Sequence, residues 1–396
     1  MSDIDQLKSA VDELVPDLVA TRRDLHQHPE LAFEEVRTSG MVAQRLRRLG
    51  LDVQTGIART GVVGLLRGEA SRAGAKTIAI RADMDALPIH EMNDIDYRST
   101  VDGKMHACGH DGHTAMLLAV ADILSRRRGE LPGNIKFVFQ PAEEAVGGAA
   151  PMVQEGALDG VDGIIGLHLI SEYPIGRVGV RSGAVYAGAD KFKITVTGKG
   201  GHAAWPHLAV DPIVVSAHII TALQTLISRE TSPFDPSVIT VGIIQAGSAF
   251  NIIPQTAEMH GTMRTFSAAH REKLLRRLRE LASGIAEAMG ATCEVQLLAG
   301  CPPCVNDAAI TEVVRRAAVE SVGADNVDSG VEVMTTASDD MACFLEAVPG
   351  CYFLVGAQNE SKGASYPHHH PRFNVDEDAL PIGVEVLARA AIELLG

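Results

Sequence analysis

The chain has 396 residues, of which 46% are hydrophobic and 21% are charged, and its net charge is −15. One hydrophobic core rarely serves so long a chain, so two domains are expected. The acidic balance argues against nucleic acid as a partner, because a phosphate backbone selects basic surfaces. No apolar run reaches membrane-spanning length, and the polar N-terminus shows no signal peptide. Six cysteines fit a reduced cytoplasmic setting better than a disulfide framework, so a cytoplasmic location is expected.

Helices and strands alternate along the first part of the chain. Helical spacing of apolar residues opens it at residues 4–18, and a second, largely apolar helix is expected at residues 112–128. Short apolar strands are expected at residues 77–82, 134–140 and 163–169. This alternation predicts an α/β domain with a mostly parallel sheet. Such sheets bind ligands beyond the carboxyl ends of their strands, so polar residues there are candidates for a site.

From about residue 187 the pattern changes to that of an α+β unit. The expected elements are strands at residues 190–197, 237–246, 255–266 and 292–298 and helices at residues 211–228 and 268–289. Their order, β-α-β-β-α-β, is that of the ferredoxin-like unit. The α/β pattern then resumes with a strand at residues 351–356 and a helix at residues 380–395. We therefore expect a discontinuous main domain of residues 1–186 and 299–396, with a smaller domain of residues 187–298 inserted into it.

A cluster of metal-ligating residue types lies at residues 105–113, M-H-A-C-G-H-D-G-H. Cys108 and His110 stand two apart and the next residue is an aspartate, which together is the composition of a transition-metal site. Cys108 alone would suggest only a buried apolar thiol. His106 and His113 are expected to be structural or to support the ligands rather than to bind metal.

Further donors stand at other expected strand ends. Glu143 and Glu144 follow the strand at residues 134–140, His168 ends the strand at residues 163–169, and three histidines occupy residues 368–370. This set exceeds the four ligands of one tetrahedral ion, so two ions that share a bridging group are expected.

The adjacent glutamates suggest a division of labour. One carboxylate can bind metal while the other holds the attacking water and takes its proton. The alternatives are a solvated pair of acids at a loop start and, for residues 368–370, an exposed loop that binds metal adventitiously.

Cys301 and Cys304 form the sequence C-P-P-C. The spacing is that of a redox pair or of half a zinc site. A zinc deaminase needs H-x-E shortly upstream, which this sequence lacks, and a thioredoxin-like pair would open a helix. A structural role is therefore expected.

Seven segments, in chain order, resemble those of one known family. They are R-R-D-L-H-Q-H-P-E-L (22–31), R-A-D-M-D-A-L-P (81–88), M-H-A-C-G-H-D-G-H (105–113), Q-P-A-E-E (140–144), G-L-H (166–168), G-K-G-G-H-A-A-W-P-H (198–207) and H-H-P-R-F (369–373). Through them the chain resembles the dinuclear metallo-amidohydrolases and metallopeptidases related to aminoacylase and carboxypeptidase G. Within these it is most similar to the branch of hippurate hydrolases and N-acyl-amino-acid amidohydrolases, including those that cleave indoleacetyl-amino-acid conjugates.

The resemblance implies roles in the main, catalytic domain. The implied metal ligands are Cys108, His110, Glu144, His168 and His369. The family's last ligand stands two places before a proline, and here Pro371 selects His369. Glu143 is implied as the general base, and Asp85 as an aspartate that supports the ligands from behind.

The resemblance also implies roles in the inserted domain. His202 resembles a histidine that reaches the active site of the other subunit and donates a hydrogen bond to the developing oxyanion. Asn251 and Arg264 lie in family-like segments and are implied to hold the substrate carboxylate, which suits an arginine fork.

The implied activity is metal-dependent hydrolysis of the amide of an N-acyl-amino acid, hippurate-like or another acyl or aryl conjugate. The implied cofactors are two divalent ions, zinc or manganese, and the same ligands admit cobalt or nickel. A homodimer or homotetramer is expected, assembled through the inserted domain. Two alternatives stay open: a dipeptidase or aminopeptidase of the same architecture, and a metal-bearing binding protein without turnover.

Overall fold

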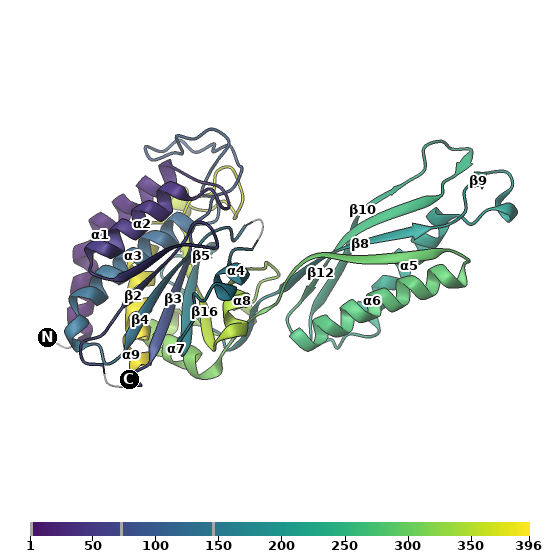
Figure 1. The fold of residues 1–396 in the computed structure, drawn as a ribbon. Coiled ribbons are helices and arrows are strands. Elements are labelled where there is room, and N and C mark those ends of the chain that lie inside the picture. The colour runs from purple at the N-terminus through teal and green to yellow at the C-terminus, as the bar shows by residue number, and fades with distance from the viewer. Residues whose placement is uncertain (1–2, 72–73, 145–146) are drawn as a thin grey trace. The chain divides into compact units, whose positions relative to one another are not determined.

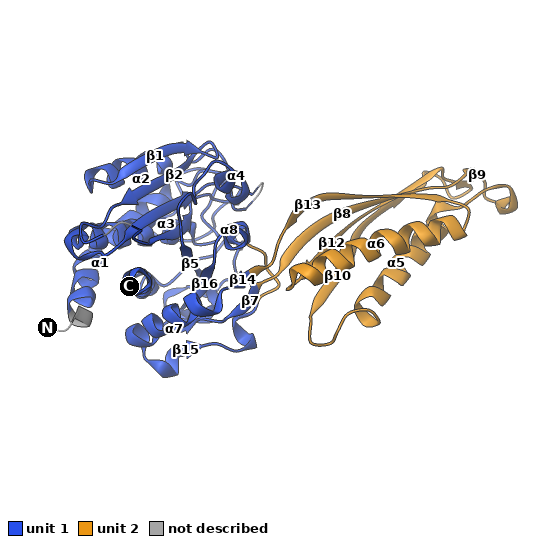
Figure 2. Ribbon diagram, turned by 60° about the horizontal axis from the view of Figure 1, so that its bottom comes forward, with its two compact units in different colours: residues 1–185, 305–334, 340–396 blue, residues 186–304, 335–339 orange. Residues whose placement is uncertain are grey.

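The computed structural model describes residues 3–71, 74–144 and 147–396, except the side chains of residues 3–5 and 299 (Figure 1). These residues form two compact units (Figure 2). Unit 1 comprises residues 1–185, 305–334 and 340–396, and unit 2 comprises residues 186–304 and 335–339.

Unit 1 is an α/β structure built on one sheet. The strands lie in the order β1 (Asp52–Ile57), β2 (Gly61–Leu66), β4 (Asn134–Gln140), β3 (Thr77–Asp83), β5 (Gly163–Pro174), β16 (Gly350–Gln358), β6 (Val178–Gly179) and β15 (Val327–Asp328). The central strands β4, β3, β5 and β16 are parallel, whereas β1 and β2 form an antiparallel hairpin and β6 runs antiparallel to β16. The predicted α/β class is confirmed, and the sheet is mixed.

Helices cover both faces of this sheet. They are α1 (Asp3–Gln27), α2 (Val36–Arg48), α3 (His110–Arg126), α4 (Ala149–Gln154), α7 (Ala308–Val322), α8 (Met341–Ala347) and α9 (Ala379–Leu395). The neighbours Gly166 and Leu167 on β5 point to opposite faces. A side chain at Gly166 would meet α8, whereas Leu167 contacts α9. The central strands are therefore buried on both faces, which explains their continuous apolar sequences.

The N-terminal helix is longer than its apolar spacing predicts. Leu7, Val11, Leu14 and Leu18 are buried as expected, while the side chain of Ile4 lies outside the described residues. The helix α1 packs on α3 and α9 and continues to Gln27. The last two turns carry Arg22 and His26, both fully buried.

Unit 2 is a four-stranded antiparallel sheet with two helices. The order in the sheet is β10 (Ser237–Ala246), β12 (Thr256–Thr265), β8 (Gly188–Thr197) and β13 (Thr292–Cys301). The helices α5 (Pro212–Ser228) and α6 (Ala268–Ala288) pack on each other and on the sheet. Along the chain these elements follow the β-α-β-β-α-β order. The shorter strands β9 (Gly201–His202) and β11 (Ile252–Ile253) pair with each other, and the chain passes between the units through β7 (Gly183–Tyr186) and β14 (Cys304–Asn306).

Local sequence signals set where the helices of unit 2 begin. Asp211 caps α5 by accepting a hydrogen bond from the backbone N–H of Ile213, and Pro212 occupies the first turn. Ser267 caps α6 by accepting one from His270. These side chains satisfy amides that no helical carbonyl can reach.

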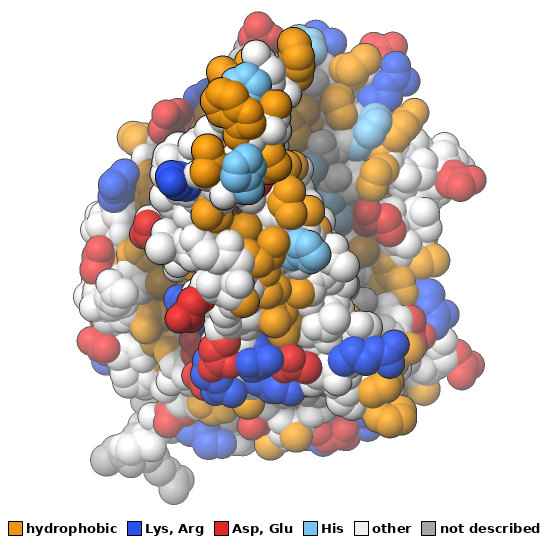
Figure 3. Space-filling model, turned by 90° about the vertical axis from the view of Figure 1, so that its right-hand side faces the viewer, with side chains coloured by type: hydrophobic (Ala, Val, Ile, Leu, Met, Phe, Trp, Pro, Cys, Tyr) orange, Lys and Arg blue, Asp and Glu red, His pale blue; other side chains and the backbone are white. Residues whose placement is uncertain are grey.

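Apolar side chains also reach the surface of unit 2. Many of them lie on β10 and α5 and around β9 and β11: Trp205, Leu208, Ile213, Val214, Val238, Ile243, Ile244, Phe250 and Ile252. Phe234, Leu297 and Leu298 are exposed as well. On the face drawn in Figure 3, hydrophobic side chains and histidines gather. The strand β10 stands at an edge of its sheet.

No helix in the described part of the chain is long and apolar enough to cross a membrane.

Candidate metal centre

The predicted ligand segment turns sharply into α3. Gly109 precedes the helix with φ 95°, a left-handed conformation in which a side chain would be strained. His110 is the first residue of α3, which therefore begins two residues earlier than predicted. The turn places Cys108 and His110 beside each other, with both side chains almost fully buried.

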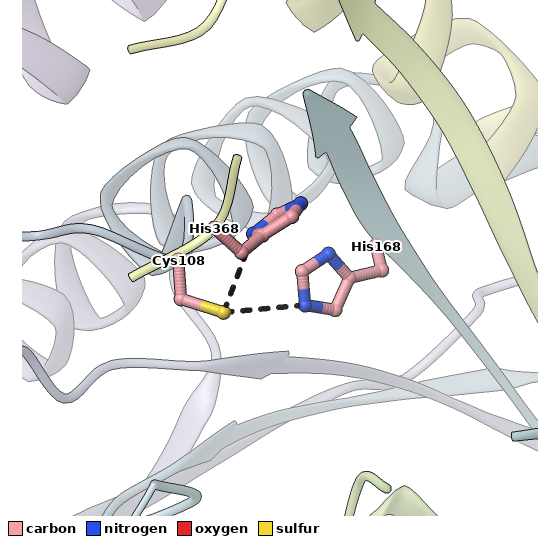
Figure 4. A group of neighbouring side chains, drawn as sticks. All are labelled: Cys108, His168 and His368. Carbon is pink, nitrogen blue, oxygen red and sulfur yellow. Dashed lines mark hydrogen bonds between the residues drawn. The ribbon is translucent and has the colours of Figure 1, made fainter. Parts of the chain in front are cut away.

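Two groups of donor atoms meet at Cys108. In the first, donor atoms of Cys108, His110 and Glu144 lie within 4.8 Å of one another. In the second, Cys108 Sγ lies 3.6 Å from His168 Nε2 and 3.6 Å from His368 Nδ1 (Figure 4). A thiolate shared by two groups of donors is the arrangement expected of a bridging ligand between two ions.

Hydrogen bonds fix which ring nitrogens face these groups. Nδ1 of His110 lies 2.9 Å from the carbonyl oxygen of Asp85. Nδ1 of His168 lies 2.7 Å from the carbonyl oxygen of the next residue, Leu169. A carbonyl oxygen only accepts, so each Nδ1 carries the proton and donates it. Each Nε2 therefore faces the Cys108 groups, as in metal-binding histidines whose other nitrogen donates to a carbonyl. Burial lowers the pKa of His168 and keeps this ring neutral.

His113 is excluded from direct ligation by the same reasoning. Its Nε2 accepts a hydrogen bond of 2.9 Å from the backbone N–H of Leu169, so its Nδ1 carries the proton and donates to Asp83 Oδ1 at 2.6 Å. Neither nitrogen has a free lone pair. The structural role expected for His113 agrees with this arrangement.

His368 and His369, two of the three consecutive histidines near the C-terminus, contact different groups. Nε2 of His369 lies 3.2 Å from Oε1 of Glu144, and the backbone of His369 has φ 64°, which is rare outside glycine. Nε2 of His368 accepts from the backbone N–H of Ser171 at 3.3 Å, so its Nδ1 carries the proton and points at Cys108. This tautomer makes His368 a hydrogen-bond donor to the sulfur of Cys108 and not a metal donor, so Cys108 and His168 are the metal donors of the second group. The sequence position of His368 did not reveal this role.

The donor set fits divalent metal. His110 Nε2 is buried and without a hydrogen-bond partner among the described residues, since its nearest carboxylate oxygens, on Asp83 and Glu144, lie 3.6 and 3.9 Å away. Burial raises the pKa of the Cys108 thiol well above its usual value, and Glu144 raises it further. A buried imidazole nitrogen without a hydrogen-bond partner and a buried thiol that ionises with difficulty are features that a bound divalent cation satisfies.

Asp85 fixes the paired glutamates. Its Oδ1 accepts a hydrogen bond from the backbone N–H of Glu143, and its Oδ2 accepts one from Glu144, both at 3.0 Å. Its carbonyl also orients His110. One buried aspartate therefore positions a predicted ligand on α3 and the two carboxylates that follow β4.

Glu35 is a supporting residue that the sequence did not reveal. Its side chain is fully buried, and its Oε1 accepts a hydrogen bond of 2.9 Å from the backbone N–H of Ala142. Ala142 directly precedes Glu143 and has φ 55°, a conformation that needs support outside glycine. Thr60 donates to Oε2 of the same carboxylate at 2.5 Å. Glu35 lies between two helices and belongs to no recognisable motif, so its contact with Ala142 could not be predicted from the sequence.

The remaining predicted site residues lie in unit 2. His202 is exposed on β9, and its Nδ1 accepts from the backbone N–H of Ala204 at 3.1 Å, so its Nε2 carries the proton. Asn251 is exposed, and Arg264 is half-buried on β12 with its Nε 3.2 Å from the carbonyl oxygen of Thr336. The structure thus brings together the donors within unit 1, while these three residues belong to unit 2.

Cys301 and Cys304 meet at a backbone carbonyl rather than at a metal. Both thiols donate to the carbonyl oxygen of Asp339, at 3.4 and 3.3 Å. The contacts fit the expected structural role, because they fasten residues 335–339 to the end of β13.

Comparisons with known proteins identify the family. Residues 79–393 match the model of peptidase family M20/M25/M40. The chain is 41% identical to thermostable carboxypeptidase 2 of Saccharolobus solfataricus, with 99% of each chain covered. It is 38% identical to N-acetylcysteine deacetylase of Bacillus subtilis, over 96% of this chain and 97% of that one. A solved Bacillus subtilis structure, described as a dinuclear metal-binding peptidase of the M20 family, superposes with a TM-score of 0.83 at 34% identity, over 97% of this chain and 99% of that one.

These similarities span nearly the whole chain and include the segments that build the donor cluster. They agree with the amidohydrolase branch expected from the sequence motifs and with a metal-dependent hydrolase that acts on amides. The chain therefore belongs to peptidase family M20/M25/M40.

Proposed function

We propose that this protein hydrolyses the amide bond of N-acyl-amino acids, releasing a carboxylic acid and a free amino acid. The observation that carries the proposal is the pair Glu143–Glu144, whose backbone amides are both held by Asp85 beside the Cys108 donors. One glutamate is thereby available to metal and its neighbour to a water molecule. The similarity to an N-acetylcysteine deacetylase supports an acyl substrate.

The proposed cofactors are two divalent ions per chain. The proposed ligands are Cys108, His110, Glu144, His168 and His369. Thiolate and imidazole favour zinc, while carboxylate and imidazole also suit manganese, cobalt or nickel. When bound, such a pair of ions polarises the amide carbonyl and lowers the pKa of a water molecule.

Glu143 is the proposed general base. It removes a proton from the attacking water, and the protonated carboxyl then delivers that proton to the nitrogen of the departing amine. One residue can serve both steps because the proton leaves and returns on the same side of the scissile bond. The hydrogen bonds from residues 143 and 144 to Asp85 support this role by limiting the movement of the segment.

His202, Asn251 and Arg264 are proposed to complete the site. The Nε2–H of His202 is a donor on an exposed side chain, which suits a hydrogen bond to the oxyanion that forms on the amide carbonyl. Arg264 and Asn251 are proposed to hold the substrate carboxylate, because a guanidinium fork matches the two oxygens of that group.

A homodimer through unit 2 is proposed to bring His202 to the metal centre of the partner subunit. The strand β10 supports this assembly, since it is an edge strand on which Val238, Ile243 and Ile244 are 44 to 50% exposed. An exposed apolar edge with unpaired backbone groups commonly pairs with another chain. A homotetramer would use a further surface of the same unit.

A peptidase that acts on free peptides is the second candidate. The similarity to a protein named as a carboxypeptidase favours peptidase activity in general. A dipeptidase or aminopeptidase must recognise a charged amino group, so it needs an acidic group where an N-acyl hydrolase needs an apolar pocket.

A substrate panel separates the two activities. Protein that has been stripped with a chelator and reconstituted with manganese or zinc is expected to release amino acid from N-acetyl- and N-benzoyl-amino acids, and chelated protein to release none. Turnover of free dipeptides with no turnover of either acyl series would assign the peptidase activity instead. Release of amino acid is followed by a ninhydrin or chromatographic assay.

A further inference from the structure

One buried arginine links two donor-bearing chain segments that lie far apart in the sequence. Arg22 lies on α1, far from both segments in sequence, and is fully buried. Its Nε donates to Asp111 Oδ2 at 2.8 Å, and its Nη2 donates to Asn374 Oδ1 at 3.0 Å. Its Nη1 lies 3.3 Å from Glu377 Oε1. The three nitrogens of a single guanidinium thus bind three residues on two different segments.

The first contact anchors the segment of Cys108 and His110. Asp111 directly follows His110 in the first turn of α3, where a carboxylate is also favoured by the helix dipole. His26, one turn after Arg22 on α1, places its Nδ1 2.8 Å from the same oxygen, Asp111 Oδ2. Two side chains of α1 therefore hold the carboxylate that adjoins a proposed ligand.

The second contact anchors the segment of His369. Asn374 lies five residues beyond it, and its Nδ2 donates to the hydroxyl of Tyr97 at 3.0 Å while its Oδ1 accepts from Arg22. The backbone N–H of His369 donates to the carbonyl oxygen of Ala107 at 2.8 Å, next to Cys108. The two segments therefore contact each other directly beside Cys108 and His369. Arg22 joins them a second time, through Asp111 and Asn374.

A second chain of contacts runs in parallel. His26 Nε2 lies 3.2 Å from Glu91 Oε1, which also accepts from Asn93 Nδ2 at 3.0 Å. The same Nδ2 donates to the carbonyl oxygen of Phe373 at 2.9 Å. The end of α1 is thus connected twice to the C-terminal segment.

The buried position of Arg22 favours an arginine over a lysine. A guanidinium offers donors in a rigid plane, so it can reach acceptors on three sides, whereas a lysine ammonium is a point charge on a flexible stem. Without Arg22, the buried Asp111 carboxylate keeps His26 as its ion-pair partner. A buried charge that loses its partner moves toward solvent or toward another cation, and here the segment that moves carries His110.

We propose that Arg22 is a positioning residue that sets the distance between the two ligand-bearing segments and so determines the affinity for metal. The proposal rests on the proposed metal centre. It assigns to the R-R-D-L-H segment a function at the metal centre, although none of its residues belongs to the donor groups.

The chain offers a matched control in the next residue. Arg23 also lies on α1, also stacks on the ring of Tyr97, at 4.6 Å compared with 4.9 Å for Arg22, and also pairs with Glu377. Its side chain is 46% exposed and binds Glu377, so in the described part of the chain it makes no ion pair with Asp111 and no hydrogen bond to Asn374. A substitution of Arg23 therefore removes the contacts of Arg23 with Tyr97 and Glu377. It leaves in place the hydrogen bonds by which Arg22 joins the two segments.

The test is a cobalt titration of chelated full-length protein, followed by the thiolate-to-cobalt charge-transfer band that reports on Cys108. Arg22→Lys and Arg22→Met are expected to weaken cobalt binding about 10- to 100-fold, as is usual for residues that orient ligands. Arg23→Met is expected to bind within about twofold of wild type, as for an exposed ion pair. Circular dichroism and thermal melts of the chelated variants separate altered binding from unfolding.

Wild-type affinity and an unchanged band in folded Arg22→Met would overturn the proposal. Should both Arg22 variants unfold, Asn374→Ala removes the contacts of Asn374 with Arg22 and Tyr97 and keeps the pair of Arg22 and Asp111. Its expected loss is about tenfold. Unchanged binding by that variant would overturn the proposal equally. The proposed metal centre fails separately, since wild-type protein would then give no charge-transfer band at all.

Discussion

Glu143→Ala is expected to lower kcat by about 10²- to 10⁴-fold, the usual contribution of a general base, while the protein keeps its full complement of metal. Glu143 and Glu144 are neighbours held by the same aspartate, yet Glu144 groups with Cys108 and His110 whereas Glu143 belongs to neither donor group at Cys108. Removal of Glu143 thus removes the proton acceptor and leaves the ligands in place. Steady-state kinetics and metal analysis of the same preparation measure both quantities.

The adjacent glutamate is the control. Glu144→Gln retains the size of the side chain and removes the charge that faces His369, so this variant is expected to lose metal as well as turnover. The opposite pattern, with metal lost in the Glu143 variant and kept in the Glu144 variant, would exchange the two roles. Near-wild-type kcat in Glu143→Ala would contradict the assignment of the base.

His202→Ala is expected to lower kcat by about 10²- to 10³-fold, the usual effect of removing one oxyanion donor. Its Nδ1 is occupied by the backbone N–H of Ala204, so only Nε2–H is available to a substrate. If this group acts in the partner's site, a mixture of inactive Glu143→Ala and His202→Ala dimers regains activity after subunit exchange. Up to about a quarter of wild-type turnover is expected, since half of randomly re-formed dimers are mixed and each mixed dimer holds one complete site.

The complementation result depends on which subunit supplies the histidine. If His202 served its own subunit, one site of each mixed dimer would lack the base and the other site would lack the hydrogen-bond donor. No activity would then return. The control is a mixture of each variant with itself through the same exchange procedure. A fully active monomer in sedimentation experiments would contradict the role of a partner subunit altogether.

Several elements of the fold were predictable because their signals are local. The helices α5 and α6 begin at an aspartate and a serine that cap them, and the central strands of unit 1 are uninterrupted apolar segments. The hairpin of β1 and β2 was not predicted. Its connection contains Ala58 and Arg59 with φ 48° and 74°, residues that carry no turn signal because glycine or asparagine usually occupies such positions.

The strand β5 shows another limit of local signals. Its predicted end at residue 169 lies next to the end of the apolar sequence at Ile170, but the strand continues to Pro174 by pairing with β16. His168 therefore lies within the strand and not at its end. Hydrogen bonds between strands, which are set by a partner far away in the sequence, decided the boundary.

The residues that meet in the donor cluster were predictable, but the orientation of their rings was not. Residue types and family-like segments pointed to Cys108, His110 and His168, which lie together. Which nitrogen of each ring faces the cluster depends on carbonyl oxygens that only folding brings near. The donor role of His368 depends in the same way on a backbone amide of β5. Glu35 escaped prediction because a single acid has no spacing that marks it.

The central claim is that the Cys108 centre holds the metal that drives amide hydrolysis. Its most direct test is to titrate chelated protein with manganese or zinc while following hydrolysis of an N-acyl-amino acid. Turnover is expected to rise from zero and to level off near two ions per chain, and Cys108→Ser is expected to remain inactive throughout. Full turnover by the chelated protein, or by Cys108→Ser without added metal, would contradict the account.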